Sequence, residues 1–188
     1  MGFGASASGD HSFAIGLGAT ASNTGAIAMG EGDNSSGQQT IAIGYANTSN
    51  GWASTAMGLN NLSTDVGTTA IGSDNTATGD AATTIGNNNF AHGDFATAIG
   101  DGTTASGLHS TALGYNTTAW VDYSTAFGCN TVGNGVNSTA MGYNTEADSF
   151  DSVVMGQFNV LWPPYGSTWI PTEPLFQIGN GADATHRS

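Results

Sequence analysis

Few side chains in this sequence have the types and spacing needed for acid–base chemistry. The closest carboxylate pairs are Glu31 with Asp33 and Glu146 with Asp148. Paired carboxyl groups can act as acid and base in hydrolysis, but both pairs fall in segments predicted as turns. No Ser/His/Asp cluster stands out from a background rich in Ser, Thr and Asp, and the repeat described below already explains the scattered glycines without a phosphate loop. The sequence therefore predicts that the protein is not an enzyme.

Metal ligands are equally sparse. Asp and Asn recur in the predicted turns, and their oxygens suit calcium, but the nonapeptide pattern of calcium-binding β-rolls is absent. His11 and His109 occupy the same position of the repeat several coils apart, so only a threefold axis would bring copies of one histidine together. No cofactor is predicted, and a structural calcium ion is a minor alternative.

Aromatic side chains are the best candidates for contact with a partner. Trp162, Tyr165 and Trp169 lie in a proline-rich stretch, and Trp120 and Tyr123 interrupt a predicted turn. Rigid amphipathic rings supply contact area and stack on sugar faces. For the first group, a receptor-contact loop and a cap over an open sheet end are both open interpretations. For the second, a lateral binding patch and packing on a neighbouring coil are both open.

All of these residues are positioned by a repeat of fourteen residues. Its markers, called the repeat glycines below, are Gly16, Gly30, Gly44, Gly58, Gly72, Gly86, Gly100, Gly114, Gly128, Gly142 and Gly156. An apolar residue precedes each of them, and this pre-glycine column comprises Ile15, Met29, Ile43, Met57, Ile71, Ile85, Ile99, Leu113, Phe127, Met141 and Met155. A fixed period with units too small to bury a core indicates a stacked repeat fold.

The repeat predicts two strands and two turns per coil. The residues before each repeat glycine alternate small and larger side chains, which is the period of a strand, and frequent glycine with β-branched residues excludes helix. A small residue five positions after each glycine belongs to a second strand of about five residues. Asn and Asp at the second and third positions after the glycine indicate a turn. The fold class is all-β, a parallel β-roll solenoid whose interior holds the small residues, with the repeat glycines leaving room inside each thin coil.

The pre-glycine column then faces outward as a continuous apolar stripe. Soluble monomers avoid such a stripe, and association about the long axis would bury it. We therefore predict a homo-oligomer, best fitted by a homotrimer. The threonines two positions earlier, from Thr55 to Thr139, also raise ice binding as a minor alternative. The adjacent column is too mixed to extend that lattice.

Composition narrows the possible partners. The chain has 188 residues, a formal net charge of −13 and a single basic residue, Arg187, outside the histidines. It therefore lacks the cations that bind nucleic acid or anionic membranes, and no apolar run is long enough for membrane insertion. One cysteine, Cys129, excludes an internal disulfide framework. Because the repeat is already running at the first residue, we expect a segment of a longer protein.

The repeat has a recognisable relative. The units Gly100–Gly114 and Asn75–Gly86 resemble the head repeat of YadA-like trimeric autotransporter adhesins, which is also found in bacteriophage and viral tail fibres. The resemblance covers about residues 1–156 and matches both the period and the internal spacing. It implies a left-handed, trimeric parallel β-roll on an extracellular fibre, either a cell-surface appendage or a virion fibre.

The repeat breaks after Gly156. We expect an array of eleven to twelve coils over residues 1–156, followed over 157–188 by a Pro/Trp-rich insertion and a closing strand. The segment Leu175–Gly179 restores the cassette nine residues out of phase. The predicted function is a trimeric fibre or adhesin head segment that attaches to a host-cell surface receptor or glycan. A purely structural fibre segment, or a viral tail-fibre shaft without its own ligand, is the alternative.

Overall fold

The structure is a computed structural model that describes residues 2–161, 167–168 and 170–188. The chain forms two compact units, Met1–Phe95 and Ala96–Ser188. The described residues form strands and turns and no helix, so none of them belongs to a helix that could cross a membrane. The predicted all-β class is confirmed.

Strands of five residues alternate with strands of two residues in the first unit. The strands are β1 (Ser6–Ala7), β2 (Phe13–Ile15), β3 (Thr20–Ala21), β4 (Ile27–Glu31), β5 (Asn34–Ser35), β6 (Ile41–Tyr45), β7 (Thr48–Ser49), β8 (Thr55–Leu59), β9 (Leu62–Ser63), β10 (Thr69–Ser73), β11 (Thr76–Ala77), β12 (Thr83–Asn87) and β13 (Phe90–Ala91). Each coil of fourteen residues thus contributes one long and one short strand.

The second unit repeats this alternation up to its last strand. Its strands are β14 (Thr97–Asp101), β15 (Thr104–Ala105), β16 (Thr111–Tyr115), β17 (Thr118–Ala119), β18 (Thr125–Cys129), β19 (Val132–Gly133), β20 (Thr139–Tyr143), β21 (Glu146–Ala147), β22 (Val153–Gln157) and β23 (Phe176–Asn180).

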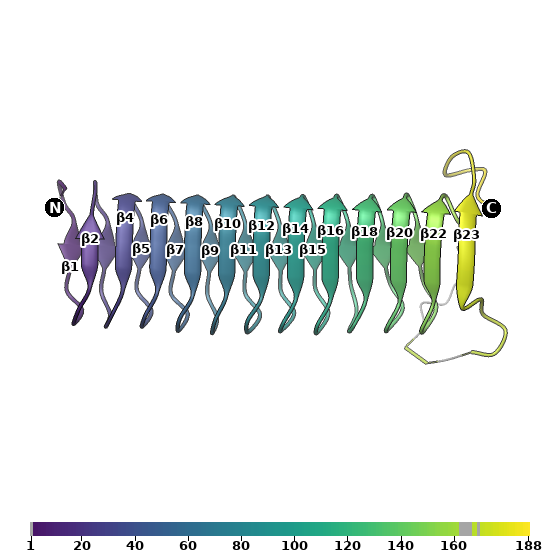
Figure 1. The fold of residues 1–188 in the computed structure, drawn as a ribbon, viewed down its shortest axis with the longest axis horizontal. Coiled ribbons are helices and arrows are strands. Elements are labelled where there is room, and N and C mark those ends of the chain that lie inside the picture. Colours follow the sequence, from purple (N-terminus) through teal and green to yellow (C-terminus); the bar gives the residue numbers. More distant parts are fainter. Residues whose placement is uncertain (1, 162–166, 169) are drawn as a thin grey trace. The chain divides into compact units, whose positions relative to one another are not determined.

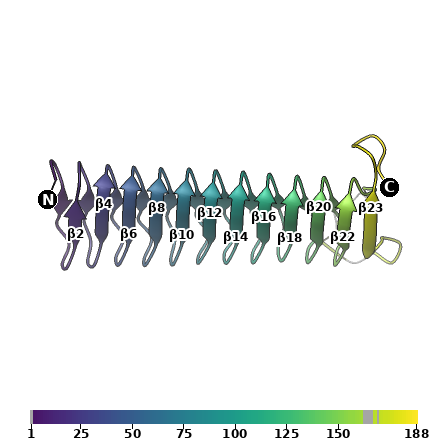
Figure 2. The same cartoon turned by 45° about the horizontal axis from the view of Figure 1, so that its top comes forward.

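Within each unit the long strands form one parallel sheet and the short strands another. In the first unit the orders are β2-β4-β6-β8-β10-β12 and β1-β3-β5-β7-β9-β11-β13. In the second they are β14-β16-β18-β20-β22-β23 and β15-β17-β19-β21. Figures 1 and 2 show the two layers from two directions, with the chain passing from one to the other in every coil. Equivalent positions pair, for example Ile71 with Ile85 and Gly72 with Gly86. The parallel β-solenoid predicted from the repeat is confirmed.

The second strand of each coil is shorter than predicted. It has two residues rather than about five, because the chain bends on both sides of it. Asn60, for example, has a φ of 52° just before β9, and Gly67 has a φ of 67° in the turn that follows β9. Backbone bonds still join the coils outside the strands, as from Gly67 N to Trp52 O at 2.8 Å.

The interior consists of small side chains. Alanines two positions before the repeat glycines are buried, as are the Ser, Thr or Ala residues two positions earlier and the small residues five positions after the glycine, apart from Ser12 and Ala7 of the first coil. The largest fully buried side chains are valine, asparagine and threonine. A core this thin gives each coil little apolar area to bury, so stability depends on the bonds between coils.

The repeat glycines are required for a different reason from the one predicted. They do not make room inside a coil; they let successive coils approach each other. A Cβ on Gly72 would lie 2.0 Å from the carbonyl oxygen of Gly86 in the next coil, and the φ of Gly72 is 122°. Only glycine accepts both the conformation and the contact.

The third residue after each repeat glycine was predicted in the turn but lies in the interior. In the first unit this column is an asparagine ladder, defined as Asn47, Asn61, Asn75 and Asn89. Asn61 Nδ2 lies within hydrogen-bonding distance of Asn47 Oδ1 (2.9 Å), Met57 O (3.0 Å) and Gly72 O (2.8 Å). Its Oδ1 accepts bonds from the backbone and side-chain nitrogens of Asn75. The positive φ falls on the residue before, such as Asn60.

In the second unit threonine occupies this interior column from Thr103 to Thr145, and Asn159 follows in the next coil. Thr117, Thr131 and Thr145 are buried, and their hydroxyl oxygens have no hydrogen-bond partner within the described part of the chain. A buried polar group without a partner destabilises a fold. The interior column is therefore a hydrogen-bonded asparagine ladder in the first unit. In the second unit it includes three threonines whose hydroxyl groups have no hydrogen-bond partner among the described residues.

The segment Leu175–Gly179, expected to be a closing strand, lies largely in β23. β23 pairs in parallel with β22, and Met155, Gly156 and Gln157 lie opposite Ile178, Gly179 and Asn180. The nine additional residues are accommodated between the two strands without a change of register. The segment Gly181–Ser188, called the C-terminal segment below, then folds back on the β22 coil, where Gly181 N donates to Gln157 O (3.2 Å) and Ser188 N to Phe158 O (3.0 Å).

Candidate functional site

The described residues enclose no pocket. They also contain no group of three or more His, Cys, Asp or Glu side chains placed to hold a metal ion. Three surface features carry the residues singled out from the sequence: the outer face of the long strands, the turns at Trp120–Tyr123, and the C-terminal end of the second unit.

The pre-glycine column lies on the outer face of the long strands. Its side chains alternate with the buried alanines and are exposed or half-buried along both units. Phe127 in β18 is 52% exposed. The threonines from Thr55 to Thr139 lie on the same face, two positions earlier in each strand. An apolar file and a threonine file therefore run side by side within each unit, in register from coil to coil.

Trp120 and Tyr123 lie on one turn of the second unit, and both are exposed. Their exposed fractions are 55% and 51%. Tyr123 stacks on His109 of the preceding coil, with ring centroids 5.6 Å apart and an interplanar angle of 13°. It also has a φ of 61°, unusual for a bulky residue. One face of Tyr123 therefore packs on the preceding coil while Trp120 is exposed, and both interpretations of this pair stay predictions.

The other three aromatic candidates, Trp162, Tyr165 and Trp169, lie outside the described residues. Their role as a contact loop or as a cap therefore stays a prediction.

Neither carboxylate pair sits in a free turn, which corrects the prediction. Glu31 ends β4 and is exposed, but Asp33 is fully buried at the start of the asparagine ladder. Its Oδ1 accepts from Asn47 N (2.8 Å) and Asn47 Nδ2 (2.9 Å), and its Oδ2 is buried without a hydrogen-bond partner in the described region. A carboxyl group inside the coil stack cannot reach a substrate, so Asp33 serves the structure.

Glu146 and Asp148 do come together. Glu146 is in β21 and half-buried, and Asp148, just after that strand, is 5% exposed. Asn134 Nδ2 donates to Glu146 Oε1 (2.6 Å) and to Asp148 Oδ1 (3.2 Å). Burial raises the pKa of Glu146 to about 7, and the adjacent Asp148 charge adds to the shift.

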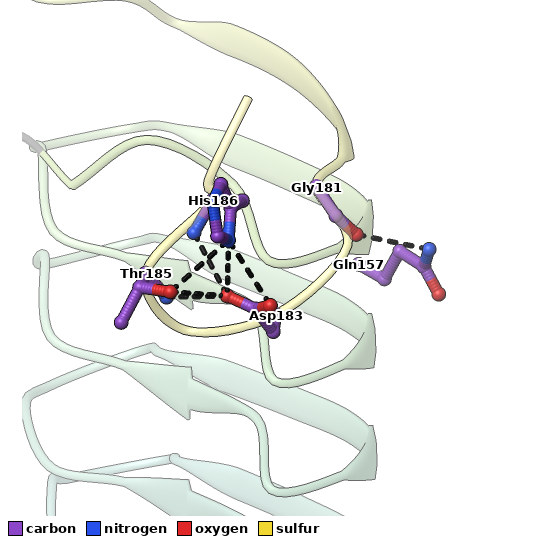
Figure 3. Close-up of polar contacts among 5 residues, drawn as sticks. All are labelled: Gln157, Gly181, Asp183, Thr185 and His186. Carbon is purple, nitrogen blue, oxygen red and sulfur yellow. Dashed lines mark hydrogen bonds and ion pairs between the residues drawn. The ribbon is translucent and has the colours of Figure 1, made fainter.

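The C-terminal segment contains a polar turn, shown in Figure 3. Asp183 Oδ1 accepts from Thr185 N (2.8 Å), Thr185 Oγ1 (2.6 Å) and His186 N (3.0 Å), and lies 2.9 Å from His186 Nδ1. Bonds from the Thr185 hydroxyl, and then from His186, lower the pKa of Asp183 to about 2. Gln157 Nε2 donates separately to Gly181 O (3.0 Å).

This turn does not resemble a catalytic centre. The Thr185 hydroxyl, 3.1 Å from His186 Nδ1, is itself bonded to Asp183, so it is held as part of the turn. The chemistry present is that of a hydrogen-bonded turn that fixes the end of the chain.

Two functional features were missed by sequence reasoning. One is the asparagine ladder, whose signal was asparagine recurring at the third position after four successive repeat glycines, Gly44 to Gly86. The other is Asn159, which lies at the same position after Gly156 and bonds both backbone groups of Glu146. Recurrence alone does not identify an interior column, because asparagine also recurs two positions after Gly114, Gly128 and Gly142, where it has a positive φ in the turn.

Comparison with known families agrees with this geometry. The family model described as the YadA head domain repeat (2 copies) matches residues 1–19, 7–32, 35–61, 64–89, 77–103, 105–131 and 134–159. No curated protein matches the chain.

Proposed function

Because the chain belongs to the YadA head domain repeat family, we propose that it is a segment of a homotrimeric extracellular fibre that attaches to a host-cell surface receptor or glycan. The observation that carries the proposal is the outward-facing pre-glycine column on a coil stack of this family. We also propose that the coils are left-handed and that the fibre is either a cell-surface appendage or part of a virion. The function requires no catalytic step and no cofactor.

The trimer is supported by the surface that it would cover. Residues such as Ile71, Ile99 and Met141 stay half-buried in the isolated chain, although they form a continuous file with their neighbours within each unit. Removing the remaining exposed area of each from water contributes about 1 kcal/mol. Summed over the coils, this is enough to favour association against its entropic cost.

We expect a charge in this column to dissociate the trimer. Ile71→Asp places a carboxylate on the outer face of β10. Three such carboxylates would meet in the trimer, and none would have a positively charged partner. The matched control is Thr76→Asp, which adds the same charge on β11 of the opposite sheet. Sedimentation at low protein concentration should give a trimer for the unmodified chain and the control, and a smaller species for Ile71→Asp. A stable soluble monomer of the unmodified chain would contradict the proposal.

The accessible aromatic turn supports attachment within the described residues. We expect the double variant Trp120→Ala/Tyr123→Asn to lose most cell or glycan binding while the trimer is retained. Asparagine is chosen because Asn137 holds the same left-handed conformation in the next coil, with a φ of 59°. Trp52→Ala is the control, since Trp52 is also exposed but lies in the first unit.

Binding of fluorescently labelled trimer to cells and to a glycan panel would measure this effect. The proposal predicts a loss of about tenfold or more in affinity, equivalent to about 1.4 kcal/mol, for the double variant alone. Unchanged attachment by a variant that still forms trimers would favour the structural-fibre alternative.

A further inference from the structure

The outer face of the short strands in the second unit, called the short-strand face below, carries two files of side chains. The first file, whose members pair in register, consists of Thr104, Thr118, Val132 and Glu146. The second file, two positions later in each coil, consists of Ser106, Trp120, Asn134 and Asp148. Backbone bonds such as that from Trp120 N to Gly133 O (3.0 Å) keep the second file in step. The pre-glycine column, which the proposed trimer would cover, lies on the other sheet.

Trp120 projects from the short-strand face. Its side chain is exposed, whereas Ser106 and Asn134, its neighbours in the file, and Thr118, on the same coil, are smaller and half-buried. The indole therefore stands above a flatter and more polar surface. An exposed ring in such surroundings offers an apolar platform on which the C–H face of a sugar can stack.

Hydrogen-bonding groups surround this platform. Ser106 and Thr118 carry hydroxyl groups, which can both donate and accept. On the other side, Asn134 Nδ2 donates to Glu146 Oε1 (2.6 Å) and so holds that carboxyl group in place. Glu146 is half-buried, and its second oxygen can bond a ligand hydroxyl in either protonation state. Because Glu146 lies two coils from Trp120, about 10 Å along the sheet, a ligand that reaches both must be longer than one sugar ring.

The charges on this face restrict the ligand. Neither file contains a basic residue, and the second ends at Asp148, next to Glu146. Arg187, the single Lys or Arg of the chain, donates to Asn159 O (3.1 Å) at the end of the second unit. A sialic acid, sulfate or phosphate group would therefore face carboxyl groups without a cation to pair with, and such a contact is repulsive.

A protein partner fits the short-strand face less well. Stable protein interfaces bury about 800 Å² on each partner, and their centres are depleted of charged residues. On this face Trp120 and Val132 are the apolar members of the two files, and the other members are polar or acidic. Sugar hydroxyls can bond such side chains, whereas an apolar protein surface would leave them unpaired.

We propose that the short-strand face around Trp120 binds an uncharged oligosaccharide. The indole stacks on one sugar ring, the hydroxyl groups of Ser106 and Thr118 bond that sugar, and Glu146 bonds a hydroxyl of a following sugar. The proposal rests on the attachment function proposed above, and it adds the class of glycan and three residues that select it.

A panel of matched glycan pairs tests the class of ligand. Each pair consists of an uncharged oligosaccharide and the same chain with a terminal sialic acid or a sulfate. The labelled full-chain trimer should bind at least one uncharged member about tenfold or more tightly than its charged counterpart. Added NaCl should leave this binding unchanged, because no ion pair contributes to it.

Equal or tighter binding of the charged members would overturn the proposal. Attachment to cells, measured with the same trimer, separates this result from a failure of the attachment function. Cells bound without a preference for uncharged glycans would contradict the class of ligand alone, whereas a trimer that binds neither cells nor glycans would contradict both.

Thr118→Lys tests the position of the site. The variant places a cation beside Trp120, so the ratio of sialylated to uncharged binding should rise by about tenfold. Thr76→Lys is the matched control, because Thr76 holds the same repeat position on β11 of the first unit. An equal rise in both variants would assign the effect to net charge, and no rise in Thr118→Lys would place the ligand elsewhere; either result overturns the proposal. Ser106→Lys, on the other side of the indole, is subject to the same comparison if Thr118→Lys does not form trimers.

Discussion

Replacing Gly72 by alanine should unfold the coils around β10, with a loss of more than about 4 kcal/mol in the free energy of unfolding. The new Cβ would lie 2.0 Å from Gly86 O and 2.9 Å from Gly86 C. Both atoms are backbone in a paired strand, so neither can yield without breaking the register of Gly72 with Gly86. The φ of 122° adds strain for any residue with a side chain.

Gly67 provides the matched control in the same coil stack. Its φ is 67°, and an added Cβ would meet nothing closer than Ala81 Cα at 3.9 Å. Ala53 and Ala81 already occupy this repeat position with φ of 54°. Gly67→Ala should therefore cost only about 1 kcal/mol. Urea titration followed by circular dichroism would compare the two, and equal stabilities of the variants would show that the contact between coils is not what requires glycine.

Replacing Asn61 by alanine should cost about 4 kcal/mol, the second largest effect expected. The substitution removes a donor that reaches Asn47 Oδ1, Met57 O and Gly72 O, all in the solenoid interior. It also leaves Asn75 Nδ2 without the acceptor Asn61 Oδ1. Each buried group left without a partner destabilises by about 1–3 kcal/mol, and the losses act together because the bonds form one network.

Thr131→Ala is the comparison from the second unit. Thr131 occupies the same interior column, but its hydroxyl has no partner in the described part of the chain. Its removal should change stability by about 1 kcal/mol or less, because the loss of a methyl group is offset by removal of an unpaired hydroxyl. Thermal unfolding of both variants measures the contrast. A similar loss of stability in the two would contradict a special role for the asparagine ladder.

The repeat made most of the fold predictable. A fixed period of fourteen residues with alternation before each glycine specified strand, turn, parallel stacking and the outward pre-glycine column, because identical coils can pair only with equivalent positions side by side. The cassette also marked Leu175–Gly179 as a closing strand, and the structure pairs β23 with β22 despite the nine additional residues. Membership of the YadA head domain repeat family follows from the same spacing.

Other features depended on which atoms meet between coils. Sequence reasoning placed Asn61 in a turn because asparagine favours turns. In the structure only the preceding residue, Asn60, has the left-handed turn conformation, and Asn61 is buried in the interior. It likewise placed Glu146 and Asp148 in turns, since a pattern along the chain does not show that Asn134 and Asn159 converge on them.

The sequence by itself thus determined the coil, its stacking and its outward apolar file, which are properties of a period. Only the tertiary structure decided why the glycines are needed, which asparagines form the ladder and which two carboxyl groups accept from Asn134. These depend on distances between residues about fourteen positions apart, where a shift of about 1 Å separates a hydrogen bond from none.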